Sequence, residues 1–129
     1  MYTMGVDVGS ASSKVVILED GIRVVTEKVV QLGTGSSGPQ RVLDEALEAS
    51  GLRMEDMTKV VATGYGRSSF EQADRQVSEI SCHAKGIYHL VPSARTIIDI
   101  GGQDAKAIKL DERGGVIQFF MNDKCAAGT

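Results

Sequence analysis

The sequence predicts an α/β fold in which an antiparallel meander of strands forms part of a mixed sheet covered by helices, followed by the first hairpin of a second, similar part. Two observations predict it. Short β-branched runs alternate with stretches of helical spacing over residues 1–94, and the pattern of the first hairpin returns near residue 98. The chain has 129 residues, enough for one compact domain and a fragment of another. We therefore expect a boundary between residues 94 and 95.

The chain begins with three predicted strands. Residues 3–8 and 14–18 are rich in β-branched side chains and are joined by a small, polar segment, which is typical of a strand, a turn and a strand. Asp20 and Gly21 then offer a hairpin turn into a third strand over residues 23–32. We expect these strands to form an antiparallel meander.

A loop, two helices and a buried strand follow. Residues 33–38 are a glycine and serine loop, and Pro39 suits the first turn of a helix that ends at Gly51. Residues 59–63 predict a short buried strand, and a second helix ends before Pro92. This order predicts a partly parallel sheet with covered faces. The apolar stripe of the second helix comprises Val77, Ile80, Ala84, Ile87 and Val91.

The strand over residues 95–100 opens a repeat of the first hairpin. The segment 98–106, Ile-Asp-Ile-Gly-Gly-Gln-Asp-Ala-Lys, has Asp, Gly and Lys at the same places as the segment 6–14, Val-Asp-Val-Gly-Ser-Ala-Ser-Ser-Lys. Both copies continue through a leucine and an acidic, glycine-containing turn into a third apolar strand. Either the chain contains an internal duplication or two generic hairpins coincide. A duplication predicts one whole copy and the opening hairpin of the next.

Asp7 and Asp99 are candidates for chemistry, because each ends a strand and stands two residues before a glycine. Glycine and small residues let backbone N–H groups approach an anion and form a nest of donors for phosphate. Two such turns would grip a polyphosphate with Mg²⁺ between the carboxylates, since hard cations prefer oxygen ligands. For a single turn, a hairpin cap is the simpler interpretation; the matched pair favours the phosphate site.

Other motifs are weaker. Residues 33–38 match G-x-G-x-x-G, but they follow the third strand of a meander, and no acidic residue that would hold a ribose follows the next strand. We interpret this segment as a flexible or ligand-facing loop. The sequence lacks G-x-x-x-x-G-K-[ST], G-x-S-x-G and H-E-x-x-H, the P-loop and the commonest hydrolase and zinc-protease motifs. Tyr65 and Arg67 either face a ligand or belong to a tight glycine turn.

The two cysteines have different surroundings. Cys125 stands beside Lys124 where a strand gives way to small residues, so a helix dipole and an ammonium group would stabilise a thiolate suited to a metal or cluster. A buried free cysteine is the alternative, because a cluster needs further thiolates from elsewhere. Adjacent helical residues point about 100° apart, so Cys82 and His83 do not easily chelate one ion. We expect Cys82 to pack in the core, and His83 and His89 to be surface or satisfied helix histidines.

Charge and hydropathy exclude several partners. The net charge is -3, and scattered Lys and Arg residues do not form the basic patch of a nucleic-acid or anionic-membrane binder. No apolar run approaches the roughly 20 residues that span a bilayer, and residues 1–10 lack the layout of a signal peptide. Two cysteines are too few for a disulfide framework. We expect a cytoplasmic protein with no nucleic-acid or membrane partner.

Five motifs occur in order along almost the whole chain and form a specific combination. The motifs are Asp7-Val8-Gly9-Ser10 with Lys14, Ala62-Thr63-Gly64-Tyr65-Gly66-Arg67, Ser81-Cys82-His83-Ala84, Asp99-Ile100-Gly101-Gly102-Gln103-Asp104, and Asn122-Asp123-Lys124-Cys125-Ala126-Ala127-Gly128-Thr129. Together they resemble the ATP-dependent activators of 2-hydroxyacyl-CoA dehydratases and are similar to the ATPase subunits of benzoyl-CoA reductases, the BadF/BadG/BcrA/BcrD-type ATPase family.

This resemblance implies a two-lobed, ribonuclease H-like fold of the actin, sugar kinase and Hsp70 type, in which each lobe supplies a phosphate loop. Residues 1–94 would form the first ATPase lobe and residues 95–129 the incomplete start of the second. Asp7 and Asp99 would lie near Mg²⁺, through water. The implied catalytic residues are Asp7, Asp99, Gln103 and Asp104. The implied nucleotide-binding residues are Gly9, Ser10, Ala11, Ser12, Ser13, Lys14, Gly101, Gly102, Gln103 and Asp104.

The resemblance also implies cofactors and partners. They would be ATP or ADP, Mg²⁺ and one [4Fe-4S] cluster shared between the subunits of a homodimer, with Cys125 as one of two cysteine ligands from each subunit. ATP hydrolysis would drive one low-potential electron, received from a donor such as ferredoxin or flavodoxin, to a 2-hydroxyacyl-CoA dehydratase or a related reductase. Cys82 does not match the second cluster position.

Three hypotheses remain open at this point. The first is that the chain is the N-terminal portion of an ATPase that activates such a dehydratase. The family continues beyond Gly128-Thr129, so we expect this portion to be inactive alone and to bind Mg-ATP weakly or not at all. A sugar-kinase-like phosphotransferase without a cluster, with Asp99 or Asp104 as its base, is the second. A non-catalytic module that folds as one lobe and binds a partner is the third.

Overall fold

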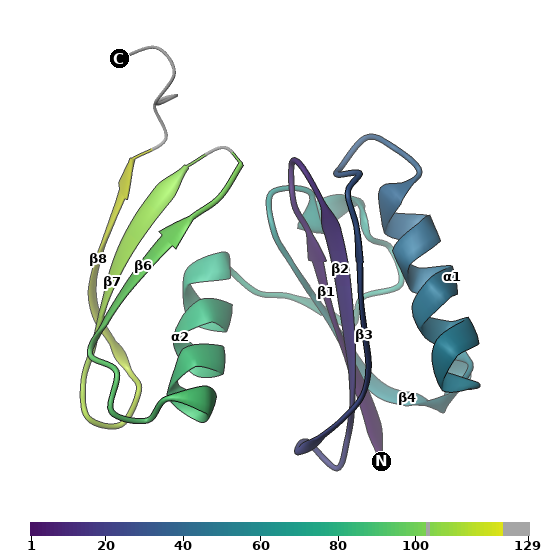
Figure 1. Cartoon of the computed structure of the whole chain (residues 1–129), viewed down its shortest axis with the longest axis horizontal. Helices are drawn as coiled ribbons and strands as arrows, with labels where there is room; N and C mark the ends of the chain where they lie inside the picture. Colours follow the sequence, from purple (N-terminus) through teal and green to yellow (C-terminus); the bar gives the residue numbers. More distant parts are fainter. Residues whose placement is uncertain (103, 123–129) are drawn as a thin grey trace. The chain divides into compact units, whose positions relative to one another are not determined.

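The computed structural model describes residues 1–102 and 104–122, which divide into two compact units, one ending at Val77 and one beginning at Ser78. The first unit contains a mixed sheet with the strand order β3-β2-β1-β4-β5 (Figure 1). β1, β2 and β3 form the expected antiparallel meander, and β4 and β5 are added in parallel. The strands are β1 (Tyr2–Val8), β2 (Ser13–Glu19), β3 (Arg23–Val30), β4 (Met57–Thr63) and β5 (Arg75–Gln76).

One face of this sheet forms the core of the first unit. α1 (Gly38–Ser50) packs on β2 and β3, and Gly51 ends it in the left-handed conformation that closes many helices. Two short 3₁₀ helices, Met54–Asp56 and Arg67–Ser69, flank β4. The alternation of strand side chains between two faces puts every second residue in the core. The buried apolar residues are Met4, Val6, Val8, Val15, Ile17, Val42, Leu43, Ala46, Val60, Ala62 and Phe70.

The second unit is a helix on a three-stranded antiparallel sheet. The sheet has the order β6-β7-β8 and comprises β6 (Thr96–Ile100), β7 (Ala105–Leu110) and β8 (Val116–Asn122). α2 (Glu79–Leu90) begins after Ser78, whose side chain accepts a hydrogen bond from the Ser81 N–H, a standard N-cap. Its small core consists of Ala84, Ile97, Ile108 and Leu110, with Ile80 and Ile87 packed against them. Neither helix in the described ranges combines the length and apolar character of a membrane span.

The sequence repeat is also a structural repeat. The pairs Asp7↔Lys14 and Val8↔Ser13 in β1 and β2 return as Asp99↔Lys106 and Ile100↔Ala105 in β6 and β7, each shifted by 92 residues. The second hairpin of each meander keeps the same shift, and even the bulge recurs, before Leu18 in β2 and before Leu110 in β7. A coincidence of two unrelated hairpins does not reproduce register and bulge together, so the duplication is confirmed.

Several boundaries differ from the sequence predictions. The third strand ends at Val30, because the chain then turns so that Leu32 O accepts a hydrogen bond from Ser13 Oγ. Val77 and Val91 lie outside α2: the Val77 N–H is bonded to Ala62 O in the first unit, and Val91 is exposed. The two-residue strand β5 was not expected, since so short a run has no periodicity.

The predicted boundary between residues 94 and 95 lies after α2, whereas the compact units divide before it. The reason is that the inner stripe of α2 packs against Ile97, Ile108 and Leu110. A contiguous division by sequence pattern does not reveal which sheet a helix covers. The assignment of these segments to the lobes of a longer protein remains a prediction.

Candidate functional site: two matched Asp-x-Gly turns

The first turn joins β1 to β2 and carries an Asp–Lys pair across its strands. Asp7 and Lys14 are register partners, and Lys14 Nζ donates a hydrogen bond to Asp7 Oδ2 over 3.2 Å. The turn is closed by the Gly9 N–H, which donates to Ser12 O over 2.9 Å. The Lys14 side chain is 43% exposed, so this pair lies at the surface of the unit.

Backbone from two later loops braces this first turn. The Thr34 N–H donates to Gly9 O, and the Gly66 N–H donates to Val8 O, each over 2.8 Å. Gly64 has φ +99°, and a Cβ there would lie 2.4 Å from both Asp7 Oδ1 and Val8 O. A larger residue at Gly64 would therefore be strained and would also collide with the turn.

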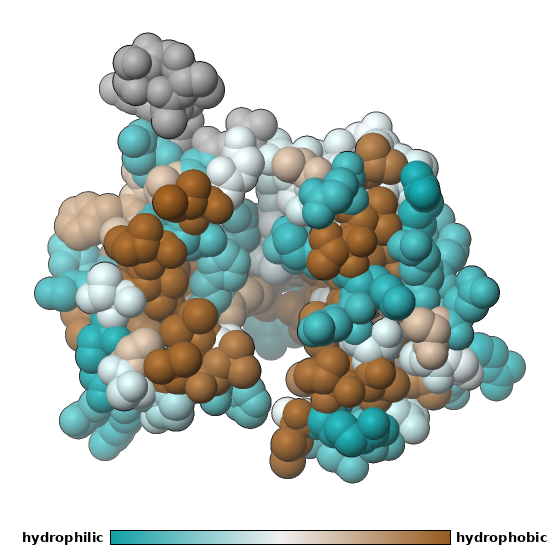
Figure 2. Space-filling view, in the orientation of Figure 1, coloured by the Kyte–Doolittle hydropathy of each residue, from teal (hydrophilic) through white to brown (hydrophobic). Residues whose placement is uncertain are grey.

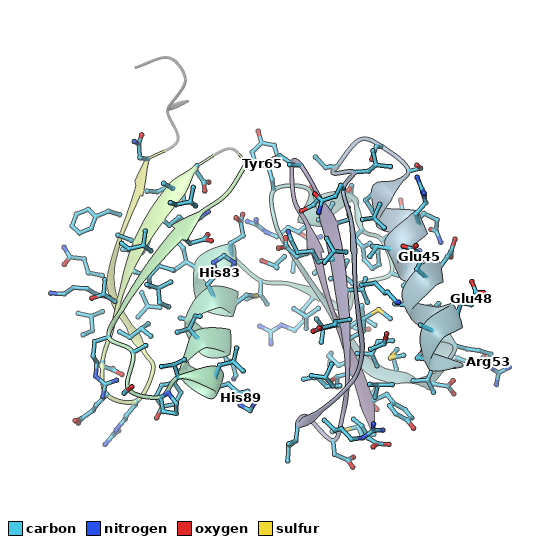
Figure 3. All side chains as sticks on the ribbon, in the orientation of Figure 1. Glu45, Glu48, Arg53, Tyr65, His83 and His89 are labelled. Carbon is cyan, nitrogen blue, oxygen red and sulfur yellow. The ribbon has the colours of Figure 1, made fainter. Side chains whose placement is uncertain are left out.

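The two glycine loops whose role the sequence left open lie against this turn. Gly33 is buried, and a Cβ added to it would lie 2.1 Å from Ser10 O, so the segment 33–38 starts in direct contact with the first turn. In the second loop, Arg67 donates through Nη1 to Gly64 O. Tyr65 is exposed (Figure 3). Both loops support the turn; neither is a dinucleotide fingerprint in a βαβ unit.

The second turn joins β6 to β7 and repeats the first in detail. The Gly101 N–H donates to Asp104 O over 2.8 Å, at positions one repeat after Gly9 and Ser12. Asp99 and Lys106 are again register partners. Their charged atoms lie 3.7 Å apart, so they form an ion pair without the direct hydrogen bond of the first turn.

Lys106 is the centre of a buried charge cluster. Only 3% of it is exposed, and its Nζ donates to Asp104 Oδ1 and to Glu79 Oε2, the latter over 3.1 Å. Burial lowers the pKa of Lys106, but the hydrogen bonds to Asp104 and Glu79 and the charges of these carboxylates raise it more, so the pKa lies above the ordinary value. Lys106 therefore remains charged throughout the neutral range.

His83 completes the cluster and was not expected to do so. Its Nδ1 lies 3.0 Å from Asp99 Oδ2. His83 follows Glu79 by four residues, so both side chains leave α2 on the same face and reach the two strands of the hairpin. The i,i+4 spacing of Glu79 and His83 was the sequence feature that could have indicated a shared role. It does not identify their partners, because these depend on which face of the sheet α2 covers.

The remaining predicted site residues have different outcomes. Ser10, Ala11 and Ser12 lie in the first turn and Gly101, Gly102 and Asp104 in the second, whereas Ser13 is the first residue of β2; their role in nucleotide binding stays a prediction. Gln103 and Cys125 fall outside the described residues. Cys82 is half-buried and lies outside the apolar cluster of α2, so the expected core packing is wrong; the inner stripe is occupied by Ile80, Ala84 and Ile87. In the described ranges, no three His, Cys, Asp or Glu side chains are grouped as a metal cage.

The comparisons with known proteins agree with this duplicated arrangement. The family model described as "BadF/BadG/BcrA/BcrD ATPase family" matches residues 4–129. A protein of Anaerotignum propionicum named activator of lactoyl-CoA dehydratase is 74% identical over 129 residues, which are 100% of this chain and 50% of that protein. A component of the benzoyl-CoA reductase of Thauera aromatica is 33% identical over 136 residues, covering 98% of this chain and 46% of its own length.

Solved structures also include similar folds. The activator of the 2-hydroxyisocaproyl-CoA dehydratase from Clostridium difficile, solved with bound ADPNP, superposes with a TM-score of 0.96 at 56% identity, over 100% of this chain and 48% of its own. The ethanolamine utilization protein EutJ from Carboxydothermus hydrogenoformans shares the fold, with a TM-score of 0.65 at 15% identity over 96% of this chain and 52% of its own.

The chain thus spans about half the length of the relatives that it matches. Its mixed sheet with an antiparallel meander is the sheet of the actin, Hsp70 and sugar kinase type of ATPase lobe, which confirms the predicted fold class. With the family model matching nearly every residue, the chain belongs to the BadF/BadG/BcrA/BcrD ATPase family.

Proposed function

We propose that this chain is the N-terminal half of an ATPase that activates a 2-hydroxyacyl-CoA dehydratase by coupling ATP hydrolysis to the transfer of one low-potential electron. The observation that carries the proposal is the duplicated Asp-x-Gly turn, with identical register and the same closing hydrogen bond in both units. The Clostridium difficile relative was solved with ADPNP, an ATP analogue, which supports a nucleotide as the ligand.

The two turns supply phosphate-binding groups of the same kind. Each places a glycine directly after the strand, where the absence of a side chain lets an anion approach the backbone N–H groups. Lys14 adds a partly exposed ammonium group beside the first turn. In contrast, Lys106 is buried and neutralised by carboxylates. We propose that Lys14 meets phosphate directly and that Lys106 supports the second turn from behind.

Asp7 and Asp99 fit a hard divalent cation such as Mg²⁺ as outer ligands. Both offer carboxylate oxygens, the donors that Mg²⁺ prefers, and Mg²⁺ keeps several of its waters in nucleotide sites. Each carboxylate also has a basic partner, Lys14 for Asp7 and both His83 and Lys106 for Asp99. A carboxylate already paired in this way suits contact through water better than direct coordination.

We also propose that Cys125 is a ligand of a [4Fe-4S] cluster in a homodimer, with the cluster as the source of the electron. Thiolates are the usual ligands of such clusters, and a shared cluster needs few from each subunit. Cys125 lies outside the described residues, so the support for this step is its sequence motif. Cys82, half-buried on α2, does not match a cluster position, so a substitution at Cys82 serves as the control for a substitution at Cys125.

The partner proposed is a 2-hydroxyacyl-CoA dehydratase, with an electron donor such as ferredoxin or flavodoxin in the cytoplasm. The identity of 74% to an activator of lactoyl-CoA dehydratase, against 33% to a component of benzoyl-CoA reductase, supports a dehydratase over a reductase. Both relatives are about twice as long as this chain, so the proposal concerns the full-length protein.

The test uses the protein at the full length of its relatives, reconstituted with iron and sulfide without oxygen. We expect ATP hydrolysis and ATP-dependent activation of a dehydratase in wild type. Asp7→Asn and Asp99→Asn should each lower ATP hydrolysis at least about tenfold, because each removes a carboxylate that would accept hydrogen bonds from the waters of Mg²⁺ and so hold the ion at the phosphates. Cys125→Ser should abolish cluster absorbance and activation, whereas Cys82→Ser should keep both.

Three results would contradict the proposal. Unchanged iron content in Cys125→Ser would remove the cluster assignment. Sugar-dependent ATP turnover by iron-free protein would instead indicate the phosphotransferase alternative, with Asp99 or Asp104 as base. Absence of nucleotide binding by the full-length protein would leave only a non-catalytic module.

A further inference from the structure

α2 holds the second turn through two side chains that reach different strands. Glu79 Oε2 lies 3.1 Å from Lys106 Nζ on β7, and His83 Nδ1 lies 3.0 Å from Asp99 Oδ2 on β6. The two residues are four positions apart, so they occupy one face of the helix, with His83 in its N-terminal half (Figure 3). One helix face therefore contacts both sides of the hairpin.

Within the first unit, the helix that covers the sheet lies on the face opposite to the Asp–Lys pair of the first turn. α1 packs on the face that carries Val6 and Val8, whereas Asp7 points to the opposite face, because successive strand residues alternate. In the second unit the arrangement is reversed, and α2 packs on the face that carries Ile97 and Asp99. Within each unit as the structure describes it, the unit's own helix thus reaches the Asp–Lys pair of the second turn and not that of the first.

The geometry shows why Asp99 needs a second partner. In the first turn, Lys14 Nζ donates directly to Asp7 Oδ2 over 3.2 Å and fixes that carboxylate. In the second turn, Lys106 donates its hydrogen bonds to Asp104 and Glu79, and its Nζ lies 3.7 Å from Asp99. Among the ion-pair partners of Asp99 in the described residues, His83 is thus the nearest, and its Nδ1 orients the carboxylate in place of the lysine.

We propose that His83 is a positioning residue that holds the Asp99 carboxylate in the orientation required at the magnesium of a bound nucleotide. This inference rests on the proposed nucleotide function. His83 itself touches neither nucleotide nor metal in the proposal; it acts through Asp99, as residues behind metal-binding groups commonly do. Glu79 has the parallel role of holding Lys106.

The experiment measures metal binding rather than turnover alone. Full-length protein is saturated with ADPNP, and Mn²⁺ binding is followed by electron paramagnetic resonance, beside the Mg²⁺ dependence of ATP hydrolysis. We expect His83→Ala to weaken Mn²⁺ binding about tenfold or more, the usual effect of removing such a supporting group. ADPNP binding in EDTA should remain within about twofold of wild type, because the N–H groups of the turns are intact.

Further variants separate positioning from packing. The side-chain nitrogen of asparagine can take the place of histidine Nδ1, so His83→Asn should restore most of the metal affinity, while His83→Gln should not. His89 lies exposed in the last turn of the same helix, and His89→Ala should leave metal binding unchanged. Melting temperatures within a few degrees of wild type establish that each variant is folded.

Each outcome is decisive. If His83→Ala binds Mn²⁺ like wild type, or if metal-free and metal-bound nucleotide weaken equally, the positioning role is wrong. Failure of His83→Asn to restore metal affinity in a folded protein also overturns it. If wild type itself binds no nucleotide, the proposed function fails first, and the two failures are thereby distinguished.

Discussion

The two Asp-x-Gly turns share one backbone but are supported in different ways. Around the first, the loops of Thr34 and Gly66 donate backbone hydrogen bonds, and Gly64 approaches too closely for any side chain. Around the second, a helix supplies Glu79, which pairs with the buried Lys106, and His83, which contacts Asp99. The repeated motif therefore specifies the turn itself, while the support of each copy comes from non-repeated sequence.

The two meanders also differ in which face of the sheet their helix covers. Val6 and Val8 are buried under α1, but their repeat equivalents Ile98 and Ile100 are 67% and 79% exposed, because α2 covers the other face of its sheet. Phe120 on β8 shares that exposed face, since it pairs with Ala107 on the same side. Hydrophobic residues are accordingly visible on the surface of the second unit, at the left of Figure 2.

The largest difference in lost stability is expected between Lys106→Met and Lys14→Met. Removing one partner of a buried ion pair typically costs about 3–5 kcal/mol, and Lys106→Met leaves three carboxylates without their cation. Lys14 is partly exposed, so its pair contributes at most about 1 kcal/mol. Native-state hydrogen exchange measures the opening free energy of each hairpin separately.

The pH dependence of the same variants gives a second readout. The pKa of Lys106 is raised above 10.5, so its stabilising contribution is complete below that pH and is lost as pH rises through the folded-state value. Wild type should therefore lose protection in β6 and β7 in strong alkali, and Lys106→Met should lack this component. Equal effects of the two methionine variants on their hairpins would contradict the contrast between buried and exposed pairs.

Gly64→Ala tests the backbone support of the first turn. Positive φ costs a non-glycine residue about 1–3 kcal/mol, and the close contacts with Asp7 Oδ1 and Val8 O add overpacking of similar size. Gly35 also has positive φ, +80°, but nothing lies within 4 Å of a Cβ there. Gly35→Ala therefore measures strain alone, and urea unfolding should show Gly64→Ala to be clearly the more destabilised. Equal losses would mean that contact with the turn is unimportant.

Truncation at one repeated position tests the reversed faces. Val8→Ala removes two buried methyl groups and should cost about 2 kcal/mol. Its repeat equivalent is exposed, so Ile100→Ala should change stability by no more than about 0.5 kcal/mol in the 129-residue chain. Hydrogen exchange in β1 and β6 provides the measurement. A loss at Ile100 as large as that at Val8 would show that its face is covered.

The smallest effect on stability is expected at the turn between β7 and β8 in the second meander. Asp111 accepts hydrogen bonds from the backbone N–H groups of Gly115 and Arg113, which lower its pKa below 3.8. Its contribution is present above pH 3.8 and is lost as pH falls through the lowered value. The corresponding turn of the first meander has positive φ at Asp20 and Gly21, and the turn of the second has it at Gly114.

Asp111→Asn should therefore reduce the acid sensitivity of amide protection between β7 and β8 and leave the β2–β3 turn unaffected. Nuclear magnetic resonance over about pH 2 to 6 measures both turns in one sample. Identical acid profiles for variant and wild type would contradict the role of Asp111.

Sequence periodicity predicted the two helices, the repeat and the described strands other than the two-residue β5, because alternation, glycines and the Asp–Lys spacing are local properties. It showed that Asp7 and Lys14 recur as Asp99 and Lys106, and the structure then showed that each pair lies opposite across a hairpin. It did not identify His83 as the partner of Asp99, because that contact depends on the face that α2 covers, which is decided by packing between segments far apart in sequence. For the same reason it placed Cys82 in the core.

The central claim is that both turns bind one nucleotide in the full-length protein. Hydrogen exchange by mass spectrometry, with and without Mg-ADPNP, tests it most directly. We predict that peptides covering residues 9–13 and 101–105 gain protection together, at the same nucleotide concentration. Protection of one turn only, or of neither under saturating nucleotide, would contradict it.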